Sequence, residues 1–163
     1  MRRQTSFFIA IPCLIGAAIL ALAQSPKAGL YEVTSKMTWQ HSPFPESMKD
    51  PRQSGAPHST QVCFTQADLD KYSGPKPTAN AGCEISNIKK RPSGMTAILT
   101  CGAPMHGKGT VETKWTDSAH SKSKVHFTGS MQIGADTKPI EWTLESSSTY
   151  KSPSCGTVKP RSD

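Results

Sequence analysis

Residues 123–133 read SKVHFTGSMQI, and their side chains alternate between apolar and polar. The apolar positions of this stretch are Val125, Phe127, Met131 and Ile133. The polar positions between them are Lys124, His126, Thr128 and Gln132. A period of two is typical of an extended strand that buries one face and exposes the other. This stretch therefore predicts a half-buried β-strand.

The same pattern recurs along the chain in segments separated by turn-forming residues. Further strands are expected over residues 31–39, 60–64, 83–89, 95–101, 108–116 and 140–145. Turns are expected at residues 91–94 (RPSG), 117–120 (DSAH) and 134–137 (GADT). One short helix is predicted after Thr65, which can cap it, with Asp68 in its first turn and an end near Lys71 or Tyr72.

These elements predict a mainly β fold. Six or seven short strands joined by local turns favour an antiparallel meander. Because sheets twist and exposed edges invite aggregation, we expect the meander to form a curved sheet or a small half-open barrel. Residues 24–163 form a single β domain in this interpretation, and residues 40–59, with four prolines, form a long loop.

The N-terminus predicts export. Arg2 and Arg3 precede an apolar stretch, and Ala21-Leu22-Ala23 offers the small residues that a signal peptidase recognises. We predict a signal peptide over residues 1–23, with cleavage after Ala23. A retained membrane anchor is the alternative, but Pro12 and Gly16 interrupt the stretch. No later run approaches the roughly 18 apolar residues of a membrane helix, so we expect a periplasmic or secreted protein without a transmembrane segment.

The mature chain keeps four cysteines, Cys63, Cys83, Cys101 and Cys155. In an oxidising compartment an even number predicts two disulfides, and four cysteines allow three pairings. Cys83 and Cys101 flank the predicted turn at Pro92, so two strands leaving that turn would bring them to the roughly 4.4–6.8 Å between Cα atoms that a disulfide needs. Cys63 would then bond Cys155. A zinc site is disfavoured because no Cys-x-x-Cys pair is present.

Several of these segments resemble a known family. They are residues 29–33 (GLYEV), residues 62–65 (VCFT) before the predicted helix, Gly82-Cys83, Thr100-Cys101 and the closing residues 155–160 (CGTVKP). Together they resemble bacterial exported proteins of the domain of unknown function 3617 family, over nearly the whole mature chain. Members usually carry Trp where this chain has Tyr31. The resemblance implies a small periplasmic or secreted protein and supplies no catalytic residue.

Four aromatic residues on the predicted inner faces are candidates for ligand binding. They are Trp39, Trp115, Trp142 and Phe127. A curved sheet lined by aromatic residues can hold a small apolar molecule or a lipid tail. The alternative is that they fill the core, because only 35% of the chain is hydrophobic.

The chain is basic, with a net charge of +7, of which Arg2 and Arg3 would leave with the signal peptide. A second hypothesis is therefore an interaction module whose polar face contacts an anionic envelope component. That face carries Lys114, Lys122, Lys124 and His126. The densest basic run, residues 89–91 (KKR), has no interleaved aromatic residue for base stacking, so no nucleic-acid partner is expected.

Enzymatic and metal-handling functions receive less support. The five histidines, with Met48 and Met105, are potential copper ligands, but their spacing is not diagnostic of a metal site. The chain has neither a Gly-x-Ser-x-Gly nor a His-Glu-x-x-His motif. We therefore predict no catalytic residue, cofactor or metal ligand. The expected function is non-enzymatic binding, with an apolar small molecule or an envelope protein as the partner.

Overall fold

The computed structural model describes residues 26–45, 55–74 and 82–160. The predicted signal peptide, residues 1–23, lies outside the described residues, as do residues 46–54 of the predicted loop. Seven strands and one helix make up the described parts. In chain order they are β1 (Gly29–His41), β2 (His58–Phe64), α1 (Gln66–Tyr72), β3 (Cys83–Arg91), β4 (Gly94–Cys101), β5 (Met105–Trp115), β6 (His120–Ile133) and β7 (Asp136–Ser152).

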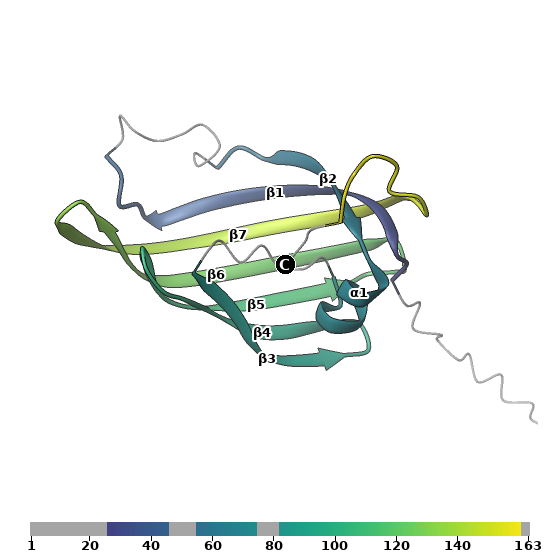
Figure 1. The fold of residues 1–163 in the computed structure, drawn as a ribbon, viewed down its shortest axis with the longest axis horizontal. Helices are drawn as coiled ribbons and strands as arrows, with labels where there is room; N and C mark the ends of the chain where they lie inside the picture. The colour runs from purple at the N-terminus through teal and green to yellow at the C-terminus, as the bar shows by residue number, and fades with distance from the viewer. Residues whose placement is uncertain (1–25, 46–54, 75–81, 161–163) are drawn as a thin grey trace, which may run out of the picture.

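All seven strands form one antiparallel sheet in the order β2-β1-β7-β6-β5-β4-β3. The sheet curves, and α1 lies in front of it near the ends of β4 and β5 (Figure 1). Strands β2 and β3 are its two edges, so the described sheet does not close into a barrel. This confirms the predicted curved, mainly β fold with one helix. Strands β3 to β7 follow one another as a meander, whereas β1 inserts between β2 and β7.

Several strands are longer than predicted. β7 spans 17 residues, while apolar alternation indicated only residues 140–145. On the inner face of its second half, Ser146 and Ser148 stand where apolar residues would alternate, so no apolar pattern marks this part of the strand. β1 continues to His41 and β2 begins at His58, so the loop between them is shorter than the predicted residues 40–59. β6 likewise begins at His120, inside the predicted turn.

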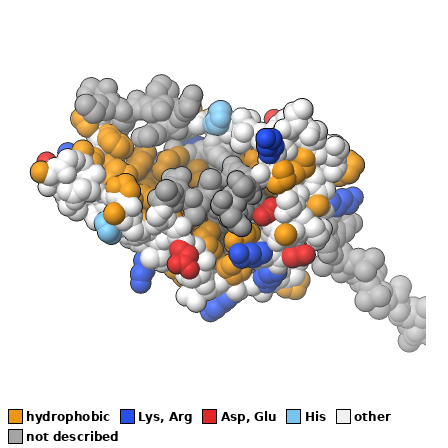
Figure 2. Space-filling view, in the orientation of Figure 1, with side chains coloured by type: hydrophobic (Ala, Val, Ile, Leu, Met, Phe, Trp, Pro, Cys, Tyr) orange, Lys and Arg blue, Asp and Glu red, His pale blue; other side chains and the backbone are white. Residues whose placement is uncertain are grey.

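The core lies on one face of the sheet, here called the concave face, and falls into two clusters. The larger cluster consists of Tyr72, Met95, Ala97, Leu99, Cys101, Val111, Phe127, Ile140 and Trp142. The smaller cluster consists of Tyr31, Val62, Phe64, Leu69 and Trp115. Both clusters combine helix and strand residues, so α1 packs against the same face. Figure 2 shows hydrophobic side chains gathered on the face that carries α1.

Glycines in β5 create the space for the completely buried ring of Phe127. Phe127 is 0% exposed. A Cβ atom at Gly107 would lie 2.7 Å from Cζ of Phe127, and one at Gly109 would lie 2.5 Å from the backbone oxygen of His126. A side chain at either position would push β5 and β6 apart, so these glycines allow the close approach of the two strands.

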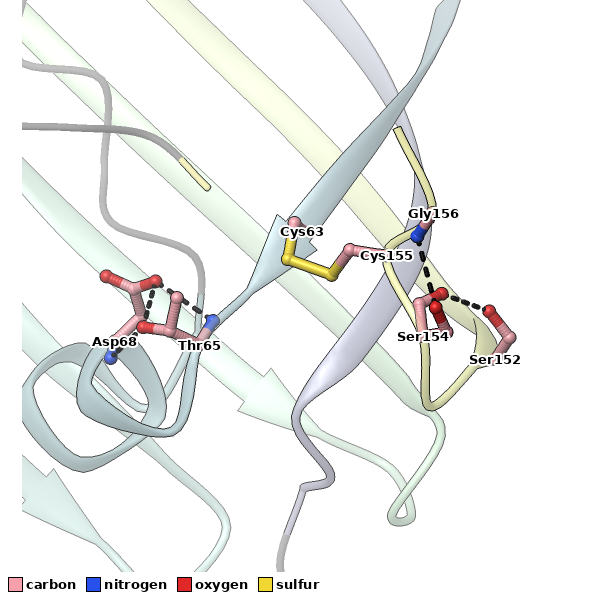
Figure 3. The surroundings of a disulfide bond; sticks show 7 residues. All are labelled: Cys63, Thr65, Asp68, Ser152, Ser154, Cys155 and Gly156. Carbon is pink, nitrogen blue, oxygen red and sulfur yellow. Dashed lines mark hydrogen bonds between the residues drawn. A yellow bond between two sulfur atoms is a disulfide. The ribbon is translucent and has the colours of Figure 1, made fainter. Parts of the chain in front are cut away.

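The helix α1 begins at a capping box. The hydroxyl of Thr65 accepts a hydrogen bond from the Asp68 backbone N–H at 3.0 Å, and the Thr65 N–H donates to the Asp68 carboxylate at 3.0 Å (Figure 3). Leu69 and Tyr72 are buried against the sheet. At the far end of the helix, the Trp115 indole N–H donates to the Ser73 carbonyl at 2.6 Å. The cap and this bond hold α1 on the concave face.

Two disulfides close the structure, in the pairing expected from the sequence. Cys63 bonds Cys155, with Cα atoms 5.5 Å apart, and joins β2 to the C-terminal segment (Figure 3). Cys83 bonds Cys101 directly across β3 and β4. Their Cα atoms are 3.9 Å apart, which is closer than the expected range. The two residues oppose each other in the register, where antiparallel strands come close.

Candidate ligand-binding cavity

A cavity of about 190 Å³ opens in the concave face, and every strand of the sheet contributes to its wall. Its described lining divides into two chemical kinds. The apolar residues are Val33, Val62, Ile85, Leu99, Val111, Val125, Trp142 and Leu144. The hydroxyl residues are Ser35, Thr60, Thr113, Ser121, Ser123, Ser146 and Ser148, while the side chain of Ser147, between two of them, lies on the other face of the strand. None of these described lining residues is charged, so the cavity suits an uncharged occupant.

The apolar wall follows directly from strand register. Val111 of β5 lies opposite Val125 of β6, and Val125 lies opposite Leu144 of β7. Trp142, two residues before Leu144 on the same face, stacks on Phe127 with ring centroids 5.2 Å apart. Val125 and Leu144 remain half-buried, so part of their apolar surface faces the cavity and would gain from contact with an apolar ligand.

The hydroxyl wall is the next stretch along the same strands. Thr113 bonds Ser123 at 2.9 Å, and Ser35 bonds Ser146 at 2.9 Å. Ser121 and Ser148 form a third pair, and both are buried. A hydroxyl has one donor and two acceptor positions. Since each pair uses one donor, each keeps a second O–H for an acceptor atom of a ligand.

An aromatic group lies next to the hydroxyl wall. Tyr31 stacks on Phe64 with ring centroids 4.1 Å apart and meets Trp115 and Tyr150 edge-on. The Tyr31 hydroxyl donates to the carbonyl of Lys27 at 2.7 Å. Burial raises the pKa of Tyr31 to about 12. The phenol is therefore neutral at physiological pH, as its apolar surroundings require.

The four aromatic residues proposed from sequence take different places. Trp142 lines the cavity, whereas Phe127 is completely buried behind it. Trp115 belongs to the smaller core cluster and bonds Ser73. Trp39 lines a separate, more open pocket of about 420 Å³ with Phe44, and its indole N–H has no hydrogen-bond partner among the residues that the structure describes. The structure thus brings one of the four residues to the cavity.

The polar face proposed from sequence lies on the opposite side of the sheet, here called the outer face. Lys114, Lys122 and Lys124 line an open depression of about 470 Å³ on this face. His126 is not among the described residues of that depression. It bonds Thr143 at 3.2 Å and lies 3.6 Å from Glu141.

The remaining predictions concern metal sites and membrane spans. Across the described ranges, no group of three or more His, Cys, Asp or Glu side chains is arranged to hold a metal ion. Two of the histidines meet carboxylates on the surface: His41 bonds Glu141 and His120 bonds Asp117, each at 2.9 Å. Within those same ranges, no helix is long and apolar enough to cross a membrane.

Sequence reasoning missed the hydroxyl side of the cavity. Its signal was present, because residues 146 and 148 of β7 and residues 121 and 123 of β6 are serines with strand spacing. Serine is also the ordinary residue of surface loops. Only the pairing of β5, β6, β7 and β1 turns these scattered serines into one wall.

The fold and cavity define a class of protein built on one open, curved antiparallel sheet that encloses a small cavity with an apolar and a hydroxyl wall. The chain belongs to the family described as proteins of unknown function, DUF3617, whose model matches residues 26–155. The match covers all seven strands and both disulfides. Neither the curated proteins nor the solved structures gave a match.

Proposed function

We propose that this protein is a non-enzymatic binding protein of the bacterial cell envelope that holds a small, uncharged, mainly apolar molecule in the cavity of its concave face. The observation that carries the proposal is the division of the cavity into an apolar wall and a hydroxyl wall. Ligand sites are typically apolar hollows with a few placed polar groups. The ligand expected here has an apolar body and an oxygen acceptor, such as a carbonyl or ether.

The size of the cavity limits the ligand. An engineered cavity of about 150 Å³ binds benzene, and typical drug-sized sites have about 300–1,000 Å³. With about 190 Å³, this cavity suits a single ring or a short branched chain. A complete lipid would have to leave most of its tail outside.

The cell-envelope part of the proposal rests on other features. The predicted signal peptide over residues 1–23 directs export, and the two disulfides are typical of proteins in oxidising compartments. Mass analysis of protein recovered from the periplasm tests this part. The expected N-terminus is Gln24, and a chain that still begins at Met1 would contradict it.

Filling the cavity tests the binding site. Val125→Phe adds a ring on the cavity side of β6, and Thr128→Phe adds the same ring on the outer face of the same strand. Calorimetric titration with anisole, which is a single ring carrying an ether oxygen, should show binding to the native protein and to Thr128→Phe. Val125→Phe should weaken binding at least tenfold, because the new ring occupies the space of the probe.

Two further measurements distinguish loss of space in the cavity from misfolding of the variant. Val125→Leu adds one methylene and should weaken binding by a smaller factor, which separates loss of space from loss of fold. Native mass spectrometry of the purified protein should show a bound neutral molecule in the native chain and less of it in Val125→Phe. Equal probe affinity in all four proteins, or no binding to the native protein, would overturn the proposal.

The outer face supports a second candidate function, which is contact with an anionic component of the envelope. The supporting observation is the depression that contains Lys114, Lys122 and Lys124. His126 lies beside it on the same face, as part of the polar surface proposed from sequence. Attachment to isolated envelopes that weakens as ionic strength rises would support this candidate. Attachment independent of salt would contradict it.

A further inference from the structure

The depression on the outer face has an unusual arrangement of charge. Four lysines and two glutamates contribute to it: Lys36, Lys114, Lys122, Lys124, Glu112 and Glu145. The lining therefore carries two more positive than negative charges. Hydroxyl side chains of Thr34 and Ser147 also belong to it.

Strand register divides these residues into two rows across the sheet. In the first row, Glu112 faces Lys124, Lys124 faces Glu145, and Glu145 faces Lys36. Charges alternate along this row, so its formal charges sum to zero. Opposite charges at facing positions contribute favourably to sheet stability.

The second row is not neutralised. Lys114 of β5 faces Lys122 of β6, and Lys122 faces Ser147 of β7. Ser147 in turn faces Thr34 of β1. Like charges at directly facing positions are destabilising. The row thus places two ammonium groups beside two hydroxyl groups without a carboxylate of its own.

The ion pairs also leave two lysines of the depression without a carboxylate partner in the described part of the chain. Lys114 pairs with Glu112 at 2.9 Å and Lys124 pairs with Glu145 at 3.6 Å. The hydrogen bond and charge of Lys114 lower the pKa of Glu112, so Glu112 is ionised at neutral pH. Among the described residues, no carboxylate lies within ion-pair distance of Lys122 or Lys36. Two positive charges in the depression therefore remain uncompensated.

We propose that this depression binds a phosphate monoester group, with Lys122 and Lys36 contacting its oxygens and the hydroxyls of Ser147 and Thr34 donating to it. A doubly charged oxyanion matches the two uncompensated charges. Lysine ammonium groups attract phosphate as point charges, and hydroxyl groups can donate hydrogen bonds to the remaining phosphate oxygens. This inference rests on the second candidate function and names the chemical group that the outer face recognises.

Calorimetric titration with inorganic phosphate and with glycerol 3-phosphate tests the site on the full mature protein. Lys122→Ser removes the uncompensated ammonium group. Lys108→Ser is the matched control, because Lys108 lies on the outer face of β5 outside the depression. Lys122→Ser should weaken phosphate binding at least fivefold, and Lys108→Ser less than twofold. Equal weakening by both variants would indicate general attraction to net charge and would overturn the site.

The unfolding temperature, measured with and without phosphate, provides a second test of the site. Without phosphate, Lys122→Ser should unfold at a higher temperature than the native protein because it removes a like-charge contact. Phosphate should raise the unfolding temperature of the native protein and of Lys108→Ser but not of Lys122→Ser. Absence of any phosphate effect on the native protein would contradict the proposal.

A vesicle experiment separates this site from the broader candidate function. Vesicles of phosphatidylcholine with phosphatidic acid carry the same phosphate monoester on a lipid, while phosphatidylglycerol vesicles carry a phosphodiester. Binding to phosphatidic acid that Lys122→Ser abolishes would identify a lipid headgroup as the source. Equal, Lys122-independent binding to both anionic vesicles would sink the phosphate site and leave only a general anionic surface contact.

Discussion

Tyr31 shows how one buried side chain contributes to both packing and pH dependence. Its ring is 0% exposed and stacked on Phe64, while its hydroxyl reaches the Lys27 carbonyl. Removal of the proton would leave a negative charge buried away from water. This is the reason that the folded protein holds the proton more tightly than an exposed tyrosine does.

The raised pKa of Tyr31 predicts a loss of stability at high pH. The folded value is about 12, against 10.0 for an unperturbed tyrosine. The contribution of the protonated phenol to the free energy of unfolding is complete below pH 10 and is lost as the pH rises toward 12. Urea unfolding at pH 8, 10 and 11 should show a steeper decline for the native protein than for Tyr31→Phe. Identical declines in the two proteins would contradict this prediction.

For single aromatic side chains, the sequence predicted the face of the strand but not whether the residue fills the core or lines the cavity. Phe127 and Trp142 were expected on inner faces, and both are buried. The alternation of the sequence indicates which side of a strand a residue occupies. It does not tell whether an aromatic residue fills the core, like Phe127, or borders a cavity, like Trp142. That difference depends on residues of other strands, such as Gly107, which makes room for the Phe127 ring.

Among the elements, α1 is the one that local sequence specifies most completely. It contains seven residues, which is too short to be stable as an isolated helix. Thr65 caps it, and Leu69 and Tyr72 attach it to the sheet. The predicted cap and end agree with the structure because both depend on neighbouring residues only.

Loss of the helix cap should therefore destabilise the protein measurably. Thr65→Ala removes the hydroxyl that accepts from the Asp68 N–H and should lower the free energy of unfolding by about 1 kcal/mol. Gln66→Ala, which changes an exposed residue one position later, is the control and should change it by only a few tenths of a kcal/mol. Urea unfolding monitored by circular dichroism measures both. A smaller effect for Thr65→Ala than for Gln66→Ala would refute the assigned role of the cap.

The sequence predicted the presence of the strands more accurately than it predicted their lengths. β6 was expected over residues 123–133 and extends only three residues further, to His120. β7 was expected over residues 140–145 and continues to Ser152. Its extension pairs with β1 on one side and β6 on the other, and hydroxyl pairs such as Ser35–Ser146 join the strands there. Cross-strand hydroxyl contacts stabilise a sheet without leaving an apolar pattern.

In the whole molecule, the two edges of the open sheet are formed by strands that are neighbours in the sequence. β2 and β3 are consecutive strands in the chain but lie at opposite edges. One disulfide fixes each edge: Cys63–Cys155 ties β2 to the C-terminal segment, and Cys83–Cys101 ties β3 to β4. For a chain of 35% hydrophobic content, such cross-links compensate for a limited core.

The two disulfides should contribute unequally to stability. In the loop-entropy description, a separation of 92 residues corresponds to about 5 kcal/mol and one of 18 residues to about 3 kcal/mol. Replacing Cys63 and Cys155 by alanine should therefore lower the free energy of unfolding more than replacing Cys83 and Cys101. Urea unfolding of the two double variants under the same conditions measures the difference. A larger loss for the Cys83 and Cys101 variant would show that local strain or packing, not loop length, determines the contribution.

The sequence by itself determined the period-two strands, their turns, the capped helix and the cysteine pairing. These features depend on residues that are close in the chain or on the small number of possible cysteine pairs. Tertiary structure decided that β1 pairs with β7, with Met37 opposite Leu144, and that serines from distant segments share one cavity wall. Alternation specifies a face and not a neighbour, because any strand with the same period can pair in its place. The choice of partner follows from the packing of the complete concave face.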